Sequence, residues 1–585
     1  MFRFVRLAAA AAIISAVAAV SAAAQELTPT QVAPSVKLVH PGAIPLYQDL
    51  DYIFGLTDKI EQKQLANVKE YFDVFLIGID RTRLFRLDVI LGEKTIHYLT
   101  SIPLKNLNRF RRGNLDDLGI DSRKQFATLY KLEMENDTGV EVLGFMRIRN
   151  FERTAEEGTI TEQYAIISKR RAEIPPTLPD PRPPMAELAK KYDLSLDVLN
   201  TKNSPEAMKI RRESFQQNTR KELLGLVKQG QQETHDDFAL RKLLTEIQLD
   251  ELARIYVDAK HANLGLVLND MKKTGVTLDV LLDPLPGSEL EASLKLLAQQ
   301  PSRFANIERT KNAILSGRIN HPLDPMRKNN FLRLSKLLRS RTKNTVAAET
   351  DSTDEEQANR KKSADLFFDM IDAGINSGVI DGFVEGHSNE NGKQTFVGGI
   401  REVDGTAIIE VIKLFPKKSR GQQVELNVDE VGDVKIHKFV AATKDHPFFS
   451  GFLGSNTVYI GSSREVVWYA AGETALDELK AAIGRVGQQN TGQADDPFVD
   501  LLIKPGPWLK LRQARHAGRN ESKAILKLRQ MAIDAFLPGD DTLTLKLNRV
   551  GNRIEGLMFG HPGILRFAGK ILADFSKENF DDSDN

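Results

Sequence analysis

Residues 542–559 read TLTLKLNRVGNRIEGLMF, and they show most clearly the pattern from which we predict the fold. Three leucines alternate with polar residues at the start of this stretch, which is typical of a strand that buries one face. Gly551 and Asn552 then favour a tight turn into a second strand. A helix is expected from Gly563. The stretch therefore predicts a strand–strand–helix unit.

The same unit can be laid out at three earlier places in the chain, and long helical segments precede most of the hairpins. An isolated hairpin is only marginally stable, so we expect the units to merge into larger antiparallel sheets that helices cover on one face. The expected strand pairs are 72–80 with 84–91, 264–269 with 276–282 and 379–385 with 395–401, followed by helices after Pro103 and from Ser288 and Asp404. The expected helices are 205–230, 232–261, 325–341, 355–377, 506–515 and 521–536, which form long helical hairpins.

Further strands follow the first and third units, and a helix over 474–484 closes the second set. The order of elements is therefore unit, meander, unit, and then the same again. This order predicts an α+β fold with duplicated halves near residues 37–300 and 301–575. The additional strands are 126–132, 140–149 and 160–168 in the first half, and 424–428, 434–441, 457–461 and 465–470 in the second.

Residues 1–24 have the features of a secretory signal peptide. Arg3 and Arg6 precede an uncharged apolar run over residues 7–20, and small residues before Gln25 fit a cleavage site. The alternative is an uncleaved membrane anchor, but a helix of this length spans roughly 21 Å and a bilayer core needs ~30 Å. No later stretch is apolar for long enough to span a bilayer. We therefore expect export, to the periplasm or beyond, with no transmembrane span after cleavage.

A chain of 585 residues is too long for one hydrophobic core. Prolines crowd residues 174–184 and predict an extended linker, whereas the acidic stretch 344–360 predicts a flexible one. The expected order is the signal peptide (1–24), a first α+β domain (37–173), the proline-rich linker (174–184), a helical hairpin with a strand–strand–helix unit (185–300), a strand with a basic amphipathic helix (301–343), the acidic linker (344–360), an α+β domain with a meander (361–490), a final helix–strand–strand–helix unit (491–575) and a disordered acidic tail (576–585).

The composition excludes several classes of function. Lysine and arginine number 80 and aspartate and glutamate 79, so the formal net charge is +1. This balance gives no electrostatic reason to bind nucleic acid, and no such partner is expected. The chain has no cysteine, which excludes disulfides, thiolate metal sites and cysteine nucleophiles. Apolar and charged contents of 41% and 27% indicate a globular protein.

No motif in the sequence predicts a catalytic residue, a cofactor or a metal site. The ten histidines lack the His-x-x-x-His spacing of helical zinc sites. Acidic residues around His235 fit the start of a helix, where they complement its dipole. Gly398 and Gly399 predict a packing point for small residues within a strand, and Ser462 fits a turn. A catalytic role for His446 beside Asp445 would need a placed nucleophile, and the sequence offers none.

One basic segment is the strongest candidate for a binding surface. Seven cations fall within residues 327–343, which contain no acid, and leucines interleave with them. The pattern predicts a basic amphipathic helix, which has the charge needed to contact an anionic lipid or polyanion. The interpretation that we favour is that the leucines pack on the adjacent sheet while the cations pair with the acidic linker downstream. The seven residues are Arg327, Lys328, Arg333, Lys336, Arg339, Arg341 and Lys343.

Four stretches resemble a family of large exported bacterial proteins whose function is uncharacterised. They are LTDKIEQKQLANVKEYFDVFLIGIDRTRLFRLDVILG (56–92), QQPSRFA (299–305), FVGGIREVDGTAIIEVIK (396–413) and NTVYIGSSREVVWYAAGETALDELKAAIG (456–484). The resemblance covers most of the chain after the signal peptide. It implies export and repeated α+β modules. It implies no activity, cofactor or partner, so it assigns a role to no residue.

Three functional hypotheses follow. The first is an exported, non-enzymatic α+β repeat protein that offers surface to a protein or to a component of the cell envelope. The second is a carrier of an apolar or anionic ligand in a cleft between the halves. The third is an exported hydrolase whose active site joins His437 or His446 to distant acids and a hydroxyl. The absence of a catalytic motif favours the first, and the sequence leaves the oligomeric state open.

Overall fold

The structure is a computed structural model that confirms the predicted α+β class. It describes residues 34–580 except 92–95, 137–138, 156–157, 175–179, 202, 231–232, 269–273, 298, 306, 350–351, 415–417, 420–421, 442–446, 488–495 and 517–522. The predicted signal peptide and His446 lie outside the described residues. The chain divides into two compact units. The first comprises residues up to 221, 255–283 and 559 onward, and the second comprises 222–254 and 284–558.

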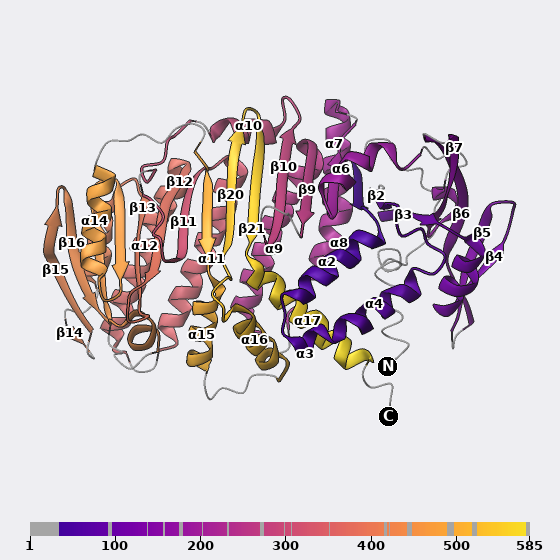
Figure 1. Ribbon diagram of the computed structural model, residues 1–585. Helices are drawn as coiled ribbons and strands as arrows, with labels where there is room; N and C mark the ends of the chain where they lie inside the picture. The colour runs from indigo at the N-terminus through magenta and orange to yellow at the C-terminus, as the bar shows by residue number, and fades with distance from the viewer. Residues whose placement is uncertain are drawn as a thin grey trace. The chain divides into compact units, whose positions relative to one another are not determined.

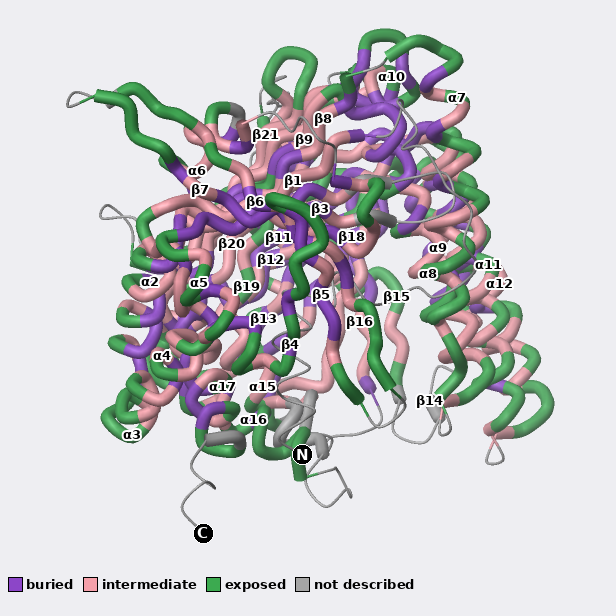
Figure 2. Tube along the Cα trace, turned by 90° about the vertical axis from the view of Figure 1, so that its right-hand side faces the viewer, coloured by how far each residue is buried: buried purple, intermediate pink, exposed green. Residues whose placement is uncertain are grey.

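The first unit is built on a sheet of ten strands in the order β4-β5-β6-β7-β3-β2-β1-β8-β9-β10 (Figure 1). The far ends of β6 and β7 form a long, exposed hairpin (Figure 2). The strands are β1 (Ser35–His40), β2 (Phe85–Leu91), β3 (Ile96–Leu104), β4 (Ile120–Lys124), β5 (Leu129–Asn136), β6 (Gly139–Ala155), β7 (Gly158–Ser168), β8 (Leu194–Leu199), β9 (Ala259–Val267) and β10 (Val276–Pro284).

Helices from both ends of the chain pack together in the first unit. The helix α17 (Pro562–Phe580) contacts α2 (Ala43–Gly55), α3 (Lys59–Gln62) and α4 (Gln64–Phe75), as Figure 1 shows. Ala573 lies in one apolar cluster with Leu50, Phe54 and Val68. The ammonium of Lys570 binds carboxylates of Asp58 and Glu61 at 3.0 and 2.7 Å. The remaining helical segments are α5 (Leu107–Arg109), α6 (Ala186–Lys191), α7 (Pro205–Ser214) and two single-turn π-helical segments, Phe110–Leu115 and Phe215–Arg220.

The strands of the second unit hydrogen-bond in the order β21-β20-β19-β11-β12-β13-β18-β17-β16-β15-β14, and the neighbours from β20 to β14 pair antiparallel. The alternating leucines of the opening stretch lie in β20, and the turn at Gly551 leads into β21 as predicted. The strands are β11 (Ala313–Pro322), β12 (Val379–Ser388), β13 (Gln394–Arg401), β14 (Lys418–Ser419), β15 (Gln422–Val431), β16 (Val434–Val440), β17 (Thr457–Ser462), β18 (Val466–Ala471), β19 (Val499–Ile503), β20 (Leu543–Val550) and β21 (Arg553–Gly560).

The core of the second unit gathers around three aromatic rings, those of Phe304, Phe383 and Trp468. A Cβ at Gly399 would lie 3.0–3.2 Å from all three, which confirms the predicted packing point in β13. The last residues of α9 (His235–Asp258) belong to the first unit and the rest of this helix to the second. The other helical segments of the second unit are α8 (Lys221–Gly225), α10 (Glu289–Leu296), α11 (Pro325–Ala347), α12 (Asp354–Ser377), α13 (Ile408–Lys413), α14 (Ala475–Gly487), α15 (Pro505–His516), α16 (Lys523–Phe536) and a π-helical turn at Pro447–Leu453.

One predicted strand is wrong for a local physical reason. Residues 72–80 are predicted as a strand, but α4 continues to Phe75 because Val68, Phe72 and Phe75 form an apolar face at helical spacing. The helix predicted after Pro103 is confirmed as a helical segment over residues 107–117, although Pro103 itself lies inside β3. The helix predicted over 232–261 is confirmed as α9, which ends at Asp258, where β9 begins.

The expected linkers and tail also contain regular structure. Helix α11 continues to Ala347 and α12 begins at Asp354, so most of the described residues within 344–360 are helical. Thr353 caps α12 together with Glu356, and acidic residues in the first turn favour a helix start. The predicted tail is helical as far as Phe580. Among the described residues, no helix combines the length and apolarity needed to cross a bilayer.

Candidate functional site

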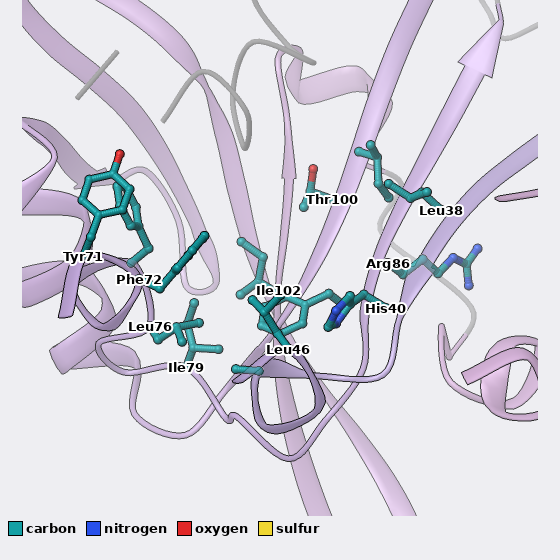
Figure 3. A pocket seen from close by; sticks show the side chains of 14 residues that line it. Leu38, His40, Leu46, Tyr71, Phe72, Leu76, Ile79, Arg86, Thr100 and Ile102 are labelled. Carbon is teal, nitrogen blue, oxygen red and sulfur yellow. The ribbon is translucent and has the colours of Figure 1, made fainter. Parts of the chain in front are cut away.

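The first unit contains an apolar cavity of about 370 Å³ between its sheet and two of its helices. Strands β1, β2 and β3 line one side, and α2 and α4 line the other. Figure 3 shows Tyr71, Phe72 and Leu76 on the helical side, opposite Leu38 and Thr100. The lining residues are Leu38, His40, Ala43, Leu46, Tyr71, Phe72, Phe75, Leu76, Ile79, Phe85, Arg86, Leu87, Thr100 and Ile102.

The antiparallel register places the sheet residues of the cavity on one face. Leu87 lies opposite Leu38 on β1 and opposite Thr100 on β3, so the three form one row across the strands. His40 and Ile102 lie two residues further along their strands and share this face, because side chains alternate along a strand. The sheet therefore presents a continuous and mainly aliphatic wall.

The turn from β1 into α2 brings the helical wall close to the sheet. Gly42 has a φ of 138°. A Cβ on it would lie 2.9 Å from the carbonyl oxygens of Arg81 and Arg83, so only glycine permits this turn. On α4, the rings of Tyr71 and Phe75 meet edge to face with centroids 4.9 Å apart. The pKa of Tyr71 is raised by burial, so its hydroxyl stays protonated.

Arg86 is the one lysine or arginine in the described lining, and its guanidinium binds groups outside the cavity. The guanidinium of Arg86 donates to Asp88 at 2.6 Å and to the carbonyl oxygen of Pro181 at 3.0 Å. In Figure 3 this group points away from the hollow, and only the methylene part of the side chain faces it. Both terminal nitrogens of the one guanidinium in the described lining are therefore already bound to protein oxygens.

The charge of Asp193, which is only half-buried, acts on the buried Asp49 and on His40 at the polar end of the cavity. The pKa of Asp49 on α2 is raised to about 7, first by burial and then by the charge of Asp193. The pKa of His40 is lowered by burial, although Asp193 opposes this effect. The electrostatic environment at this end is neutral to negative, which disfavours an anion.

The seven predicted basic residues all lie on α11, and five of them bind acids from two neighbouring helices of the same unit. On the α9 side, Arg327 binds Glu251 at 2.6 Å and Arg341 binds Asp237 at 2.5 Å. Arg333 also pairs with Glu246. On the α12 side, Arg339 binds Asp369 and Asp372 at 2.8 and 2.9 Å, and Lys343 binds Asp365 at 2.9 Å.

The pairing partners of α11 thus come from α9 and α12 and not from the acidic linker named in the sequence analysis. Lys328 donates to the carbonyl oxygen of Asn376 at 3.3 Å. Lys336 has no ion pair among the described residues. Most of the positive charge of α11 is therefore balanced by acids of the second unit. The described residues of α11 form no continuous row of unpaired basic side chains.

A buried histidine and serine meet in the second unit, but their geometry does not suit nucleophilic catalysis. The backbone N–H of Asn427 donates to Nδ1 of His437 at 3.2 Å, and Nε2 lies 3.1 Å from Oγ of Ser462. Because Nδ1 accepts, the proton of the neutral ring is on Nε2, which donates to the serine and cannot accept its proton. The ring fills a β-bulge between β15 and β16.

A second histidine pair joins residues that no sequence motif connects. Nε2 of His261 on β9 lies 2.6 Å from a carboxylate oxygen of Asp197 on β8, and this contact raises the pKa of His261. Asn263 donates to Ser195 at 3.0 Å, but Ser195 is fully buried and no substrate can reach it. In the described residues no group of three His, Asp or Glu side chains is placed to hold a metal.

The sequence pattern does not predict the cavity, because the apolar run over residues 72–80 suggests a strand and hides the helical wall of α4. The spacing of Leu65, Val68, Phe72 and Phe75 in the stretch LTDKIEQKQLANVKEYFDVF indicates a helix and could have shown an apolar face. The hollow itself depends on the distance between α4 and the sheet, and no sequence pattern reports that distance.

Comparisons with known proteins add no constraint on the site: no family model, no curated protein and no solved structure matches the chain.

Proposed function

We propose that this protein is an exported, non-enzymatic binding protein that holds an apolar small molecule in the cavity between β1–β3 and α2–α4. The observation that carries the proposal is an apolar hollow of about 370 Å³ within one unit. Sites for small molecules are concave, mainly apolar and about 300–1,000 Å³ in volume, with a few polar groups that fix orientation. His40 and Thr100 supply such groups here.

The energetics of burying apolar surface also support a ligand. The lining is mainly apolar, and removing apolar surface from water contributes about 25 cal/mol per Å². A ligand that covers this lining and does not bind the unfolded chain should therefore stabilise the protein.

Binding of a neutral fluorescent probe tests the proposal. Phenylnaphthylamine should gain fluorescence with the wild-type protein, and saturation should correspond to one site. Leu46→Trp places a larger ring in the cavity and should abolish the gain. Ile44→Trp is the matched control, because Ile44 lies on the same helix but is 44% exposed. Equal binding by wild type and Leu46→Trp would contradict the proposal.

A second candidate function is contact with a protein partner, which the sequence analysis placed first. Helix α16 exposes Ile525, Leu526 and Leu528, each between 46% and 48%. Exposed apolar residues that cluster on one helix are typical of interaction surfaces. A cross-linked partner that is captured from envelope extract by the wild type but lost with Leu528→Glu would support this function. Capture that is unchanged by Leu528→Glu would count against it.

Export and internal duplication belong to the same proposal. The charged and apolar pattern of residues 1–24 supports export, and the recurring strand–strand–helix order supports duplicated halves. Cell fractionation with N-terminal sequencing of the mature protein tests export. We expect the mature chain to begin at Gln25, and a cytoplasmic chain that retains Arg3 would contradict it.

A further inference from the structure

The polar end of the cavity contains a single well-oriented hydrogen-bond donor. His40 is the last residue of β1, and its Nδ1 accepts the backbone N–H of Gly42 at 3.1 Å. The proton of the neutral ring is therefore on Nε2. This Nε2 has no hydrogen-bond partner in the described part of the chain, and the residue lines the cavity. The N–H group is thus available to a ligand.

The charge around His40 determines which kind of acceptor fits. Burial lowers the pKa of His40, so the imidazole is neutral near neutral pH. The nearby charge of Asp193 is negative, and Arg86 directs its guanidinium to Asp88. A carboxylate in this position would lose its hydration without gaining a cation, which is strongly unfavourable in an apolar site. A carbonyl or ether oxygen would meet a donor without this penalty.

We propose, building on the apolar binding function above, that the ligand is an uncharged molecule with an apolar body and one hydrogen-bond acceptor, such as a ketone or ester. His40 donates from Nε2 to that acceptor and fixes the orientation of the ligand. The apolar body packs between Leu38 and Leu87 on the sheet and the aromatic rings of α4. Thr100 contributes a hydroxyl further along the wall (Figure 3).

Three probes with one skeleton test the proposal by calorimetric titration: naphthalene, methyl naphthyl ketone and naphthoate. We expect the ketone to bind roughly three- to tenfold more tightly than naphthalene, which corresponds to one net hydrogen bond. Naphthoate should bind more weakly than the ketone. Equal affinity for naphthalene and the ketone, or tightest binding of naphthoate, would overturn this inference but leave the apolar site intact. Failure of all three probes to bind would overturn the proposed function and this inference together.

Two variants identify the donor. His40→Leu should remove the advantage of the ketone while naphthalene still binds, whereas Thr100→Val should retain it. The opposite pattern would overturn the assignment to His40. Because His40→Leu also removes the acceptor of the Gly42 N–H, an infrared measurement on the wild-type protein accompanies it. The carbonyl stretch of the bound ketone should move to lower frequency than in hexane, and an unshifted band would overturn the proposal.

Discussion

The guanidinium of Arg254 on α9 binds the carboxylate of Asp324 through both terminal nitrogens, at 2.7 and 3.1 Å. Both side chains are buried within the second unit. Asp324 is also the N-cap of α11, where it accepts from the backbone N–H of Arg327 at 3.1 Å, and it accepts from the hydroxyl of Ser293 at 2.8 Å. One carboxylate thus joins three helices, α9, α10 and α11, and fixes where the basic helix begins.

Asp324→Asn should destabilise the second unit strongly, because it leaves the charge of Arg254 buried without its partner. Removing one member of a buried pair costs about 3–5 kcal/mol. Urea unfolding followed by circular dichroism measures the change. Glu410→Gln is the control, since its pair with Lys413 is exposed and contributes at most about 1 kcal/mol. A loss below that of the control variant would show that the Arg254 pair is unimportant for stability.

Glu402 should lower the free energy of unfolding as the pH rises, whereas an acid in an ion pair raises it. Its Oε2 is buried without a partner, against the backbone of α12 at Gly374, and burial raises its pKa from 4.5 to about 7. The folded protein then holds this proton more tightly than the unfolded chain. The free energy of unfolding therefore falls as the pH rises from 4.5 to about 7, by roughly 3 kcal/mol in all.

Glu402→Gln removes this titration, so the variant should be more stable than the wild type above pH 7 and similar to it below pH 4.5. Denaturant unfolding at the two ends of this range checks the difference. Glu410→Gln again serves as the control, because its carboxylate is exposed. A wild-type advantage above pH 7 would mean that the carboxylate is stabilised in its charged form.

The paired cations of α11 should contribute to folding more than to membrane binding. Most of them are bound to acids of α9 and α12, so little charge remains for an anionic surface. We expect no co-sedimentation with vesicles that contain phosphatidylserine at physiological salt. Arg339→Gln should lower the melting temperature without altering that result. Strong vesicle binding that is lost with Lys336→Glu would instead support the basic surface predicted from the sequence.

Ser462 should be inert toward reagents that label serine hydrolases. The ring of His437 donates to its Oγ and so cannot withdraw its proton. A fluorophosphonate probe should leave the protein unlabelled at concentrations that fully label a control hydrolase. Stoichiometric labelling that is lost in Ser462→Ala would contradict this geometry and favour the hydrolase hypothesis.

The sequence correctly predicts those elements whose pattern depends only on residues close together along the chain. The alternating leucines of β20, the turn at Gly551 and the helix start at Ser288 each carry their own signal, and all three are confirmed. Residues 72–80 were mistaken for a strand, because a short apolar run is ambiguous between strand and helix. The acidic residues of 344–360 suggested a flexible linker, although acids at the start of α12 are stabilising.

The candidate site was harder to predict because its parts are far apart in the sequence. His40, Tyr71 and Thr100 line one cavity only after β1, α4 and β3 have packed. The partners of α11 show the same difficulty: Asp237 lies 104 residues from Arg341 along the chain, so no local pattern links them. Whether the halves arose by duplication stays a prediction.

The proposed function depends most on whether an apolar molecule enters the cavity between α2, α4 and the sheet. Nuclear Overhauser effects from bound naphthalene to methyl-labelled protein test this directly. We predict contacts to methyl groups of Leu38, Leu46, Leu76 and Ile102, and none to exposed methyls such as those of Ile44. Saturable binding without contacts to these four residues, or no binding at all, would contradict the account.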